Sequence, residues 1–155
     1  MTKVANTDRT VSRRHRRMVS SGRVAPAEGT TMDFASIRII TNDVDRLAGF
    51  YELVTGAPAT RPAPVFAEFR TGAGALAIAS TATVAMLGEH APKPGSNDSV
   101  IIEFAVADVE AEFARIHEAL DDVVLEPTTM PWGNRSVLFR DPDGNLVNLF
   151  SRPAG

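Results

Sequence analysis

The sequence runs twice through the same order of secondary-structure signals, and this repeat is the strongest constraint on the fold. The strand-like run at residues 36–41 leads through Asp43 into apolar residues at helical spacing, which stop at Gly56. A second strand-like run at residues 101–106 leads through Asp108 into another helical pattern. Both aspartates stand where a carboxylate accepts the free N–H groups of a helix's first turn. We therefore expect two modules, each beginning with a strand and an amphipathic helix.

Each half then continues into a hairpin and leaves room for one more short strand. The hairpin strands are expected at residues 66–70 with 75–80, and at 137–140 with 145–150. The extra strands are expected near residues 59–63 and 123–128. The predicted fold class is α+β, with two tandem βαβββ modules forming a cupped mixed sheet. Module one spans about residues 33–82 and module two residues 100–152, joined by a polar connector at 83–99.

A length of 155 residues fits one domain, which we place at residues 32–155, after a basic and flexible extension at residues 1–31. Seven basic and two acidic side chains give the extension a net charge of +5, which leaves −8 for the remainder of a chain whose total is −3. The extension lacks interleaved aromatic residues, so we do not expect nucleic-acid binding. No apolar run is long enough to span a membrane, and no export signal follows the twin arginines, so we expect a cytoplasmic protein. The absence of cysteine excludes disulfides, thiolate metal ligands and thiol nucleophiles.

Two segments carry a resemblance to a known family. Residues 131–150 read PWGNRSVLFRDPDGNLVNLF, and residues 42–51 read NDVDRLAGFY. Together with the repeat, they resemble the vicinal oxygen chelate superfamily, which includes glyoxalase I, extradiol dioxygenases and bleomycin-resistance proteins. The resemblance covers about residues 33–152 and implies a single glyoxalase-like domain whose two sheets line a cup. It also implies a homodimer, because relatives commonly pair, and leaves open whether each cup forms within one chain or between two.

The resemblance further implies where metal ligands would lie, on the first and last strands of each module. Counting from the helix-cap aspartates places Ser36 and Ile101 where a ligating His is expected. Counting from the hairpin glycines places Ile78 and Asn148 where a Glu is expected. None of these four side chains suits a divalent transition metal. Because the three histidines, His15, His90 and His117, are scattered along the chain, we expect no metal and no cofactor.

If Ser36, Ile101 and Asn148 face the cup, as the resemblance implies, strand alternation predicts which other side chains line it, because residues two apart share a face. The lining set is Ser36, Arg38, Glu68, Glu103, Asn148 and Phe150. Its charges have two interpretations: a structural salt bridge from Arg38 to Glu103 or Glu68, or recognition of a ligand's polar groups.

The only tryptophan, Trp132, lies on a loop three residues before Arg135. One interpretation is a lid or stacking surface for a planar ligand, with Arg135 as a further ligand-binding residue. The other is that Trp132 covers the core or a dimer seam.

The function predicted from these observations is metal-independent binding of a small molecule, without catalysis. The protein would sequester a planar or aromatic ligand, such as an antibiotic or a metabolite, as in antibiotic-resistance proteins of this superfamily. The alternative is a lyase, isomerase or oxygenase of the glyoxalase or dioxygenase type. Such an enzyme would use a relocated metal site, or Glu103 or Glu68 as a general base.

Overall fold

The computed structural model describes residues 32–154, so the predicted extension at residues 1–31 lies outside the described residues. The first module contains β1 (Ser36–Thr41), α1 (Val44–Thr55), β2 (Thr60–Ala63), β3 (Phe66–Thr71) and β4 (Gly74–Ser80). The second contains β5 (Ile101–Ala105), α2 (Val109–Ile116), η2 (His117–Ala119), β6 (Val123–Thr129), β7 (Arg135–Arg140) and β8 (Leu146–Ser151). None of the helices within residues 32–154 is long and apolar enough to cross a membrane.

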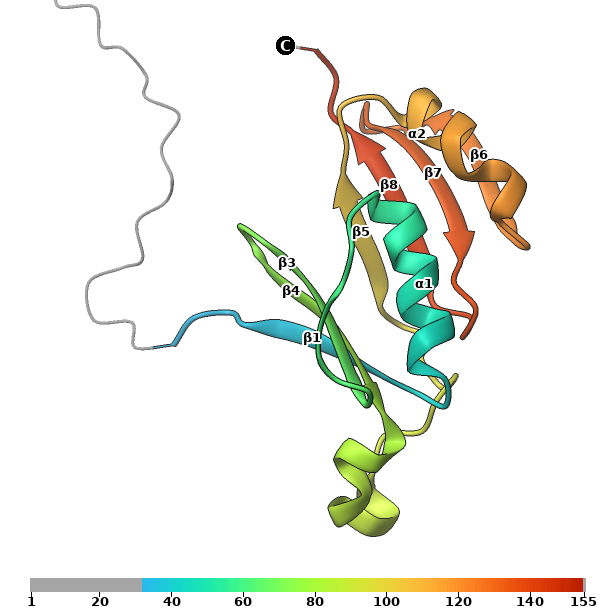
Figure 1. The fold of residues 1–155 in the computed structure, drawn as a ribbon. Coiled ribbons are helices and arrows are strands. Elements are labelled where there is room, and N and C mark those ends of the chain that lie inside the picture. Colours follow the sequence, from blue (N-terminus) through green and yellow to red (C-terminus); the bar gives the residue numbers. More distant parts are fainter. Residues whose placement is uncertain (1–31, 155) are drawn as a thin grey trace, which may run out of the picture. The chain divides into compact units, whose positions relative to one another are not determined.

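Each module forms its own four-stranded mixed sheet, in the order β1-β4-β3-β2 in the first and β5-β8-β7-β6 in the second. The first strand of each module pairs in parallel with the last, and the other pairings are antiparallel. The predicted α+β class and the two βαβββ modules are therefore confirmed (Figure 1). The identical strand order in both halves is what the sequence repeat requires.

The two helices begin where the capping aspartates predicted. The Asp43 carboxylate accepts the Arg46 N–H at 3.0 Å, and that of Asp108 accepts the Ala111 N–H at 3.0 Å. Helix α1 ends at Gly56, whose φ of 67° lies in the left-handed region that favours glycine. The second helix is shorter than its apolar pattern predicted, because it tightens into the 3-10 turn η2 after Ile116.

The connector is more ordered than its polar composition predicted. It opens with the 3-10 segment η1 (Thr81–His90), which the hydroxyl of Ser80 caps by accepting the Ala82 N–H at 3.2 Å. Val84 of η1 is buried against Ile40 and Ala79. The single buried residue Val84 thus fixes η1 to the first sheet. One apolar residue forms no periodic pattern, so the sequence did not predict this segment.

A shared hydrophobic core joins the two modules. It takes Phe69, Leu76 and Ile78 from the first sheet, together with Leu47 and Tyr51 from α1. The second sheet and α2 add Ile102, Val109, Ile116, Val137, Phe139, Val147 and Leu149. Figure 1 shows α1 and α2 on the same side of the second sheet, with α2 beside β6 and β7. We call the side of each sheet that supplies this core its helix face.

Two polar contacts fix α1 against the second module. The Tyr51 hydroxyl donates to Asp141 Oδ2 at 2.7 Å, although both residues are buried. Asp141 also accepts the N–H groups of Asp143 and Asn145 on Oδ1 and the Asn145 side-chain amide on Oδ2. The Arg115 guanidinium of α2 donates to the carbonyls of Leu53 and Val54, at 2.6 and 2.7 Å, where α1 ends. These contacts hold the helix of one module against the turn and the helix of the other.

The Tyr51 contact predicts the behaviour of an isosteric variant. Tyr51→Phe keeps the ring packing and removes one donor from a buried carboxylate, which should lower the free energy of unfolding by about 1–3 kcal/mol. Urea denaturation followed by circular dichroism measures the change. Ser99→Ala, which removes an exposed hydroxyl, should stay within about 0.5 kcal/mol of wild type. Equal stability of the two variants would contradict the structural role of the pair.

The same pair predicts a loss of stability in alkali. Burial, and after it the Asp141 carboxylate, raise the pKa of the Tyr51 hydroxyl above its ordinary value. Tyr51 then ionises near pH 10 in the unfolded chain but not in the folded protein. The contribution of Tyr51 to the free energy of unfolding is therefore fully present below about pH 10 and is lost as the pH rises further.

Because the chain has one tyrosine, tyrosinate absorbance reports Tyr51 alone. The tyrosinate signal should appear only together with loss of the native circular dichroism. Ionisation near pH 10 with an intact native spectrum would show that the hydroxyl is not held in this way.

Candidate functional site

The predicted cup residues lie on the face of each sheet that points away from the helices, which we call the open face. On the first sheet, Arg38 pairs across to Ala77, and Ala77 pairs to Glu68, so these three form one row. On the second sheet, Glu103, Asn148 and Leu138 form the corresponding row. Strand alternation adds Ser36 to the first face and Ile101 and Phe150 to the second. The predicted repeat equivalence of Arg38 and Glu103 follows from this register.

The ion pair considered between Arg38 and Glu68 does not form. The two residues are two strands apart, and adjacent strands are about 4.8 Å apart, so their backbones lie about 10 Å from each other. The carboxylate of Glu68 instead accepts from the Arg70 guanidinium at 2.9 Å. Arg38 is exposed and makes no ion pair with any residue in 32–154. The guanidinium of Arg38 is therefore available on the open face.

The second ion pair considered, between Arg38 and Glu103, is also absent. Glu103 is exposed, and its Oε2 accepts a hydrogen bond from Asn148 Nδ2 at 2.7 Å. Asn148 is only 8% exposed, and its other polar atom, Oδ1, has no hydrogen-bond partner among residues 32–154. The open face of the second sheet thus carries a carboxylate fixed by a neighbouring amide.

The structure corrects one of the four positions assigned to a family metal site. Ile78 lies on the helix face, where it is fully buried, and the residue equivalent to Asn148 is Ala77. The count slipped because the first hairpin turn is one residue shorter than the second: Arg70 pairs with Ala75, whereas Arg140 pairs with Leu146. A one-residue slip moves a side chain to the opposite face of a sheet.

The corrected set still does not fit a metal. Ser36, Ala77 and Ile101 bring no imidazole or carboxylate, and Asn148 brings only a neutral amide. Within residues 32–154, no three His, Asp or Glu side chains gather in a group that could hold a metal ion. The donor set of metal-using relatives is therefore not reproduced at these positions.

The other predicted site residues lie apart from these rows. Trp132 is 67% exposed on the turn between β6 and β7. Arg135 shares the helix face with Val137 and makes an ion pair with Glu110 of α2 at 2.5 Å. Arg135 is therefore separated from the open face by the sheet, and we leave it out of the candidate site. Phe150 lies on the open face, with the Arg152 guanidinium 5.8 Å from its ring centroid.

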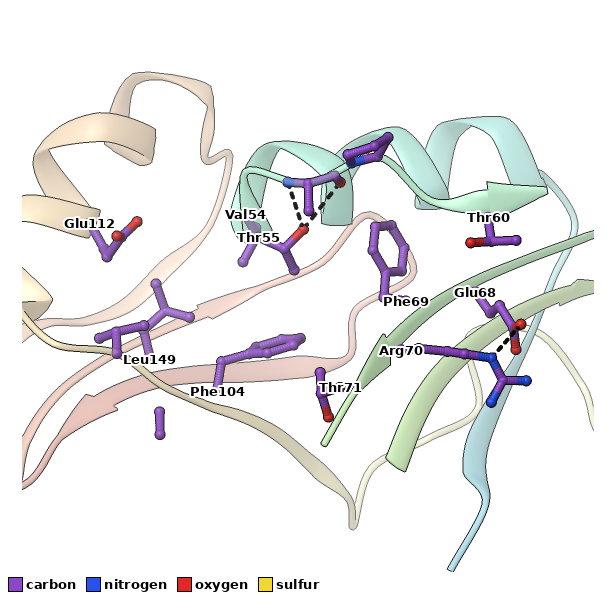
Figure 2. Close-up of a pocket in the computed structure, with 14 residues that line it drawn as sticks. Val54, Thr55, Thr60, Glu68, Phe69, Arg70, Thr71, Phe104, Glu112 and Leu149 are labelled. Atoms are coloured by element: carbon purple, nitrogen blue, oxygen red, sulfur yellow. Dashed lines mark hydrogen bonds and ion pairs between the residues drawn. The ribbon is translucent and has the colours of Figure 1, made fainter. Parts of the chain in front are cut away.

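The three charged candidates line different cavities within one chain. Arg38 borders a cavity of about 370 Å³ beside the connector, and Glu103 one of about 180 Å³ between β4 and β5. Glu68 borders the cavity of about 440 Å³ drawn in Figure 2, between the end of α1 and the ends of β3 and β5. One chain therefore does not bring Arg38, Glu68 and Glu103 into a single site.

The cavity in Figure 2 was not predicted from the sequence. Phe69 from the first module and Phe104 from the second line it, with Thr55, Thr60 and Thr71 adding hydroxyl groups. It exists only because two modules meet, and no local pattern reports that junction. Arg70, which pairs with Glu68 at its edge, could have been found by alternation, since it lies two residues after Glu68 on the same strand.

Comparison with known proteins gives the family. The uncharacterized protein YraH of Bacillus subtilis strain 168 is 26% identical over 125 residues, 77% of this chain and 98% of YraH. A glyoxalase/bleomycin resistance protein/dioxygenase family enzyme from Burkholderia phytofirmans PsJN has a TM-score of 0.68 at 18% identity, covering 79% of this chain and 100% of that one. TioX from Micromonospora sp. ML1 has a TM-score of 0.60 at 24% identity, with coverage of 79% and 100%.

Both structural likenesses show a common fold. The family itself follows from the profile match, because residues 33–149 match the model of the Glyoxalase/Bleomycin resistance protein/Dioxygenase superfamily. The chain therefore belongs to this superfamily.

Proposed function

We propose that this protein binds a planar or aromatic small molecule on its open faces without a metal and without catalysis. The observation that carries the proposal is that the guanidinium of Arg38, which makes no ion pair with residues 32–154, and the carboxylate of Glu103, held by Asn148, occupy equivalent positions on the open faces of the two sheets. Charged side chains with free hydrogen-bonding atoms beside apolar ones are what orients a ligand in a mostly apolar pocket.

The site requires a second copy of the chain. The helix faces of both sheets are buried in one shared core. The open faces, in contrast, keep four exposed residues: Ser36, Arg38, Glu103 and Ala105. Two exposed apolar residues accompany them: Phe34 is 68% and Ile101 48% exposed, and both border one cavity. Exposed apolar groups of this kind mark interaction surfaces. We propose a homodimer in which open faces of the two copies enclose the ligand.

Ligand anchoring accounts for the two acidic residues better than proton abstraction does. Glu68 already accepts a hydrogen bond from Arg70, and Glu103 accepts one from Asn148. Each carboxylate is thus held in place by a donor, as a ligand anchor requires. Sequestration of an antibiotic or a metabolite is then achieved by enclosure alone.

Metal independence is tested by adding metals. Purified without a histidine tag, the protein should contain metal far below one ion per chain. Nickel, zinc, manganese and ferrous iron should leave its thermal midpoint unchanged, and EDTA should leave ligand binding unchanged. Binding of one ion at a hundred times its dissociation constant would add about 2.7 kcal/mol of stability, which a thermal shift detects easily. Near-stoichiometric metal, or strong stabilisation by one ion, would point instead to a catalytic site with relocated ligands.

A further inference from the structure

The amide of Asn148 has a fixed orientation that leaves one atom unpaired. Its neighbour Glu103 can only accept hydrogen bonds, so Nδ2 must face the carboxylate, as it does at 2.7 Å. Oδ1 then points elsewhere and receives no hydrogen bond from any described residue, although the residue is more than nine-tenths buried. A buried acceptor without a donor is destabilising, and such groups concentrate at functional sites.

The surroundings of this amide attract positive charge. Glu103 contributes a carboxylate whose second oxygen, Oε1, makes no hydrogen bond with a described residue. Phe150, two residues from Asn148 on the same face, already has the Arg152 guanidinium 5.8 Å from its ring centroid. An aromatic ring draws cations to its face because of its quadrupole. A carboxylate, an unpaired carbonyl oxygen and an aromatic ring therefore meet on one face, with Leu138 and Ile101 as apolar neighbours.

We infer that the ligand of this site carries a protonated amine beside its planar ring. The inference rests on the proposed function and names the chemical class of its ligand. The ammonium group donates to the carboxylate of Glu103, and its charge offsets the partial negative charge of Asn148 Oδ1. Asn148 acts as a positioning residue, since it holds the carboxylate through Nδ2. The Arg152 guanidinium occupies the ring of Phe150 when no ligand is bound, so it competes with the ligand.

Matched probes test the inference. Naphthylmethylamine, naphthylmethanol and naphthylacetic acid share one ring system and differ in charge, and calorimetric titration of the full chain gives their dissociation constants. We expect the amine to bind about tenfold or more tightly than the alcohol, and the acid most weakly, because a hydrogen bond to a charged group is worth that much.

Variants locate the preference. Glu103→Gln should lower the affinity for naphthylmethylamine to that for naphthylmethanol, while the affinity for naphthylmethanol stays unchanged. Asn148→Ala should lower the affinity for naphthylmethylamine without changing that for naphthylmethanol. Arg152→Ala should raise the affinity for the amine, because it removes the competing cation. Glu118→Gln removes the same charge from an exposed position of η2 and should change nothing. Thermal midpoints of each variant establish that it is folded.

The outcomes separate the two proposals. Equal affinities for the three probes would overturn the amine inference and leave the proposed function standing, as expected if Arg38 of a second copy neutralises Glu103. An amine preference that survives Glu103→Gln would also overturn it. Failure of all three probes to bind would contradict the proposed function itself.

Discussion

The hydrogen bond from Tyr51 to Asp141 connects the two halves of this molecule. The donor lies on the first helix, and the acceptor lies in the last hairpin turn, 90 residues along the chain. A buried carboxylate is stable only when it is well supplied with donors, and Asp141 receives two backbone N–H groups, the Asn145 amide and the Tyr51 hydroxyl. The turn residues that form the second hairpin thereby also fix the place of the first helix.

This arrangement determines which faces are left for binding. Because α1 contacts Phe69 of its own sheet and Phe104 and Phe139 of the other, the helix faces of both sheets are consumed by a common core. Within residues 32–154, the connector covers part of the first sheet's open face, where Val84 of η1 and Ala91 pack against Ile40 and Ala79. The remaining area of the open faces carries the charged residues Arg38 and Glu103 and the exposed apolar residue Ile101. Exposed apolar side chains of this kind mark binding surfaces, and we attribute Ile101 to a partner or a ligand.

Local signals in the sequence were sufficient for most of the fold. Asp43 and Asp108 located the helix starts, because a cap depends on only a few neighbouring residues. Alternation placed Arg38 on the same face as Ser36, and Glu103 on the same face as Ile101, whereas the expectation that these faces line the cup came from the family resemblance. Ile78 was assigned to the wrong face because the two hairpin turns differ by one residue, so the same count from each turn glycine ends on opposite faces of the two sheets. The partner of Glu68 was also missed, although Arg70 lies two residues away on the same face of the same strand, where alternation could have found it.

The central claim is that the open faces of two copies together form the binding site, and sedimentation velocity over a range of concentrations tests it most directly. The account predicts a dimer for the wild-type chain. Ile101→Arg, on the open face, should convert it to a folded monomer that no longer binds ligand. Met86→Arg places the same charge on a residue of η1 that is 92% exposed, and it should leave the dimer intact. A wild-type chain that is monomeric at every concentration and still binds ligand would contradict the account.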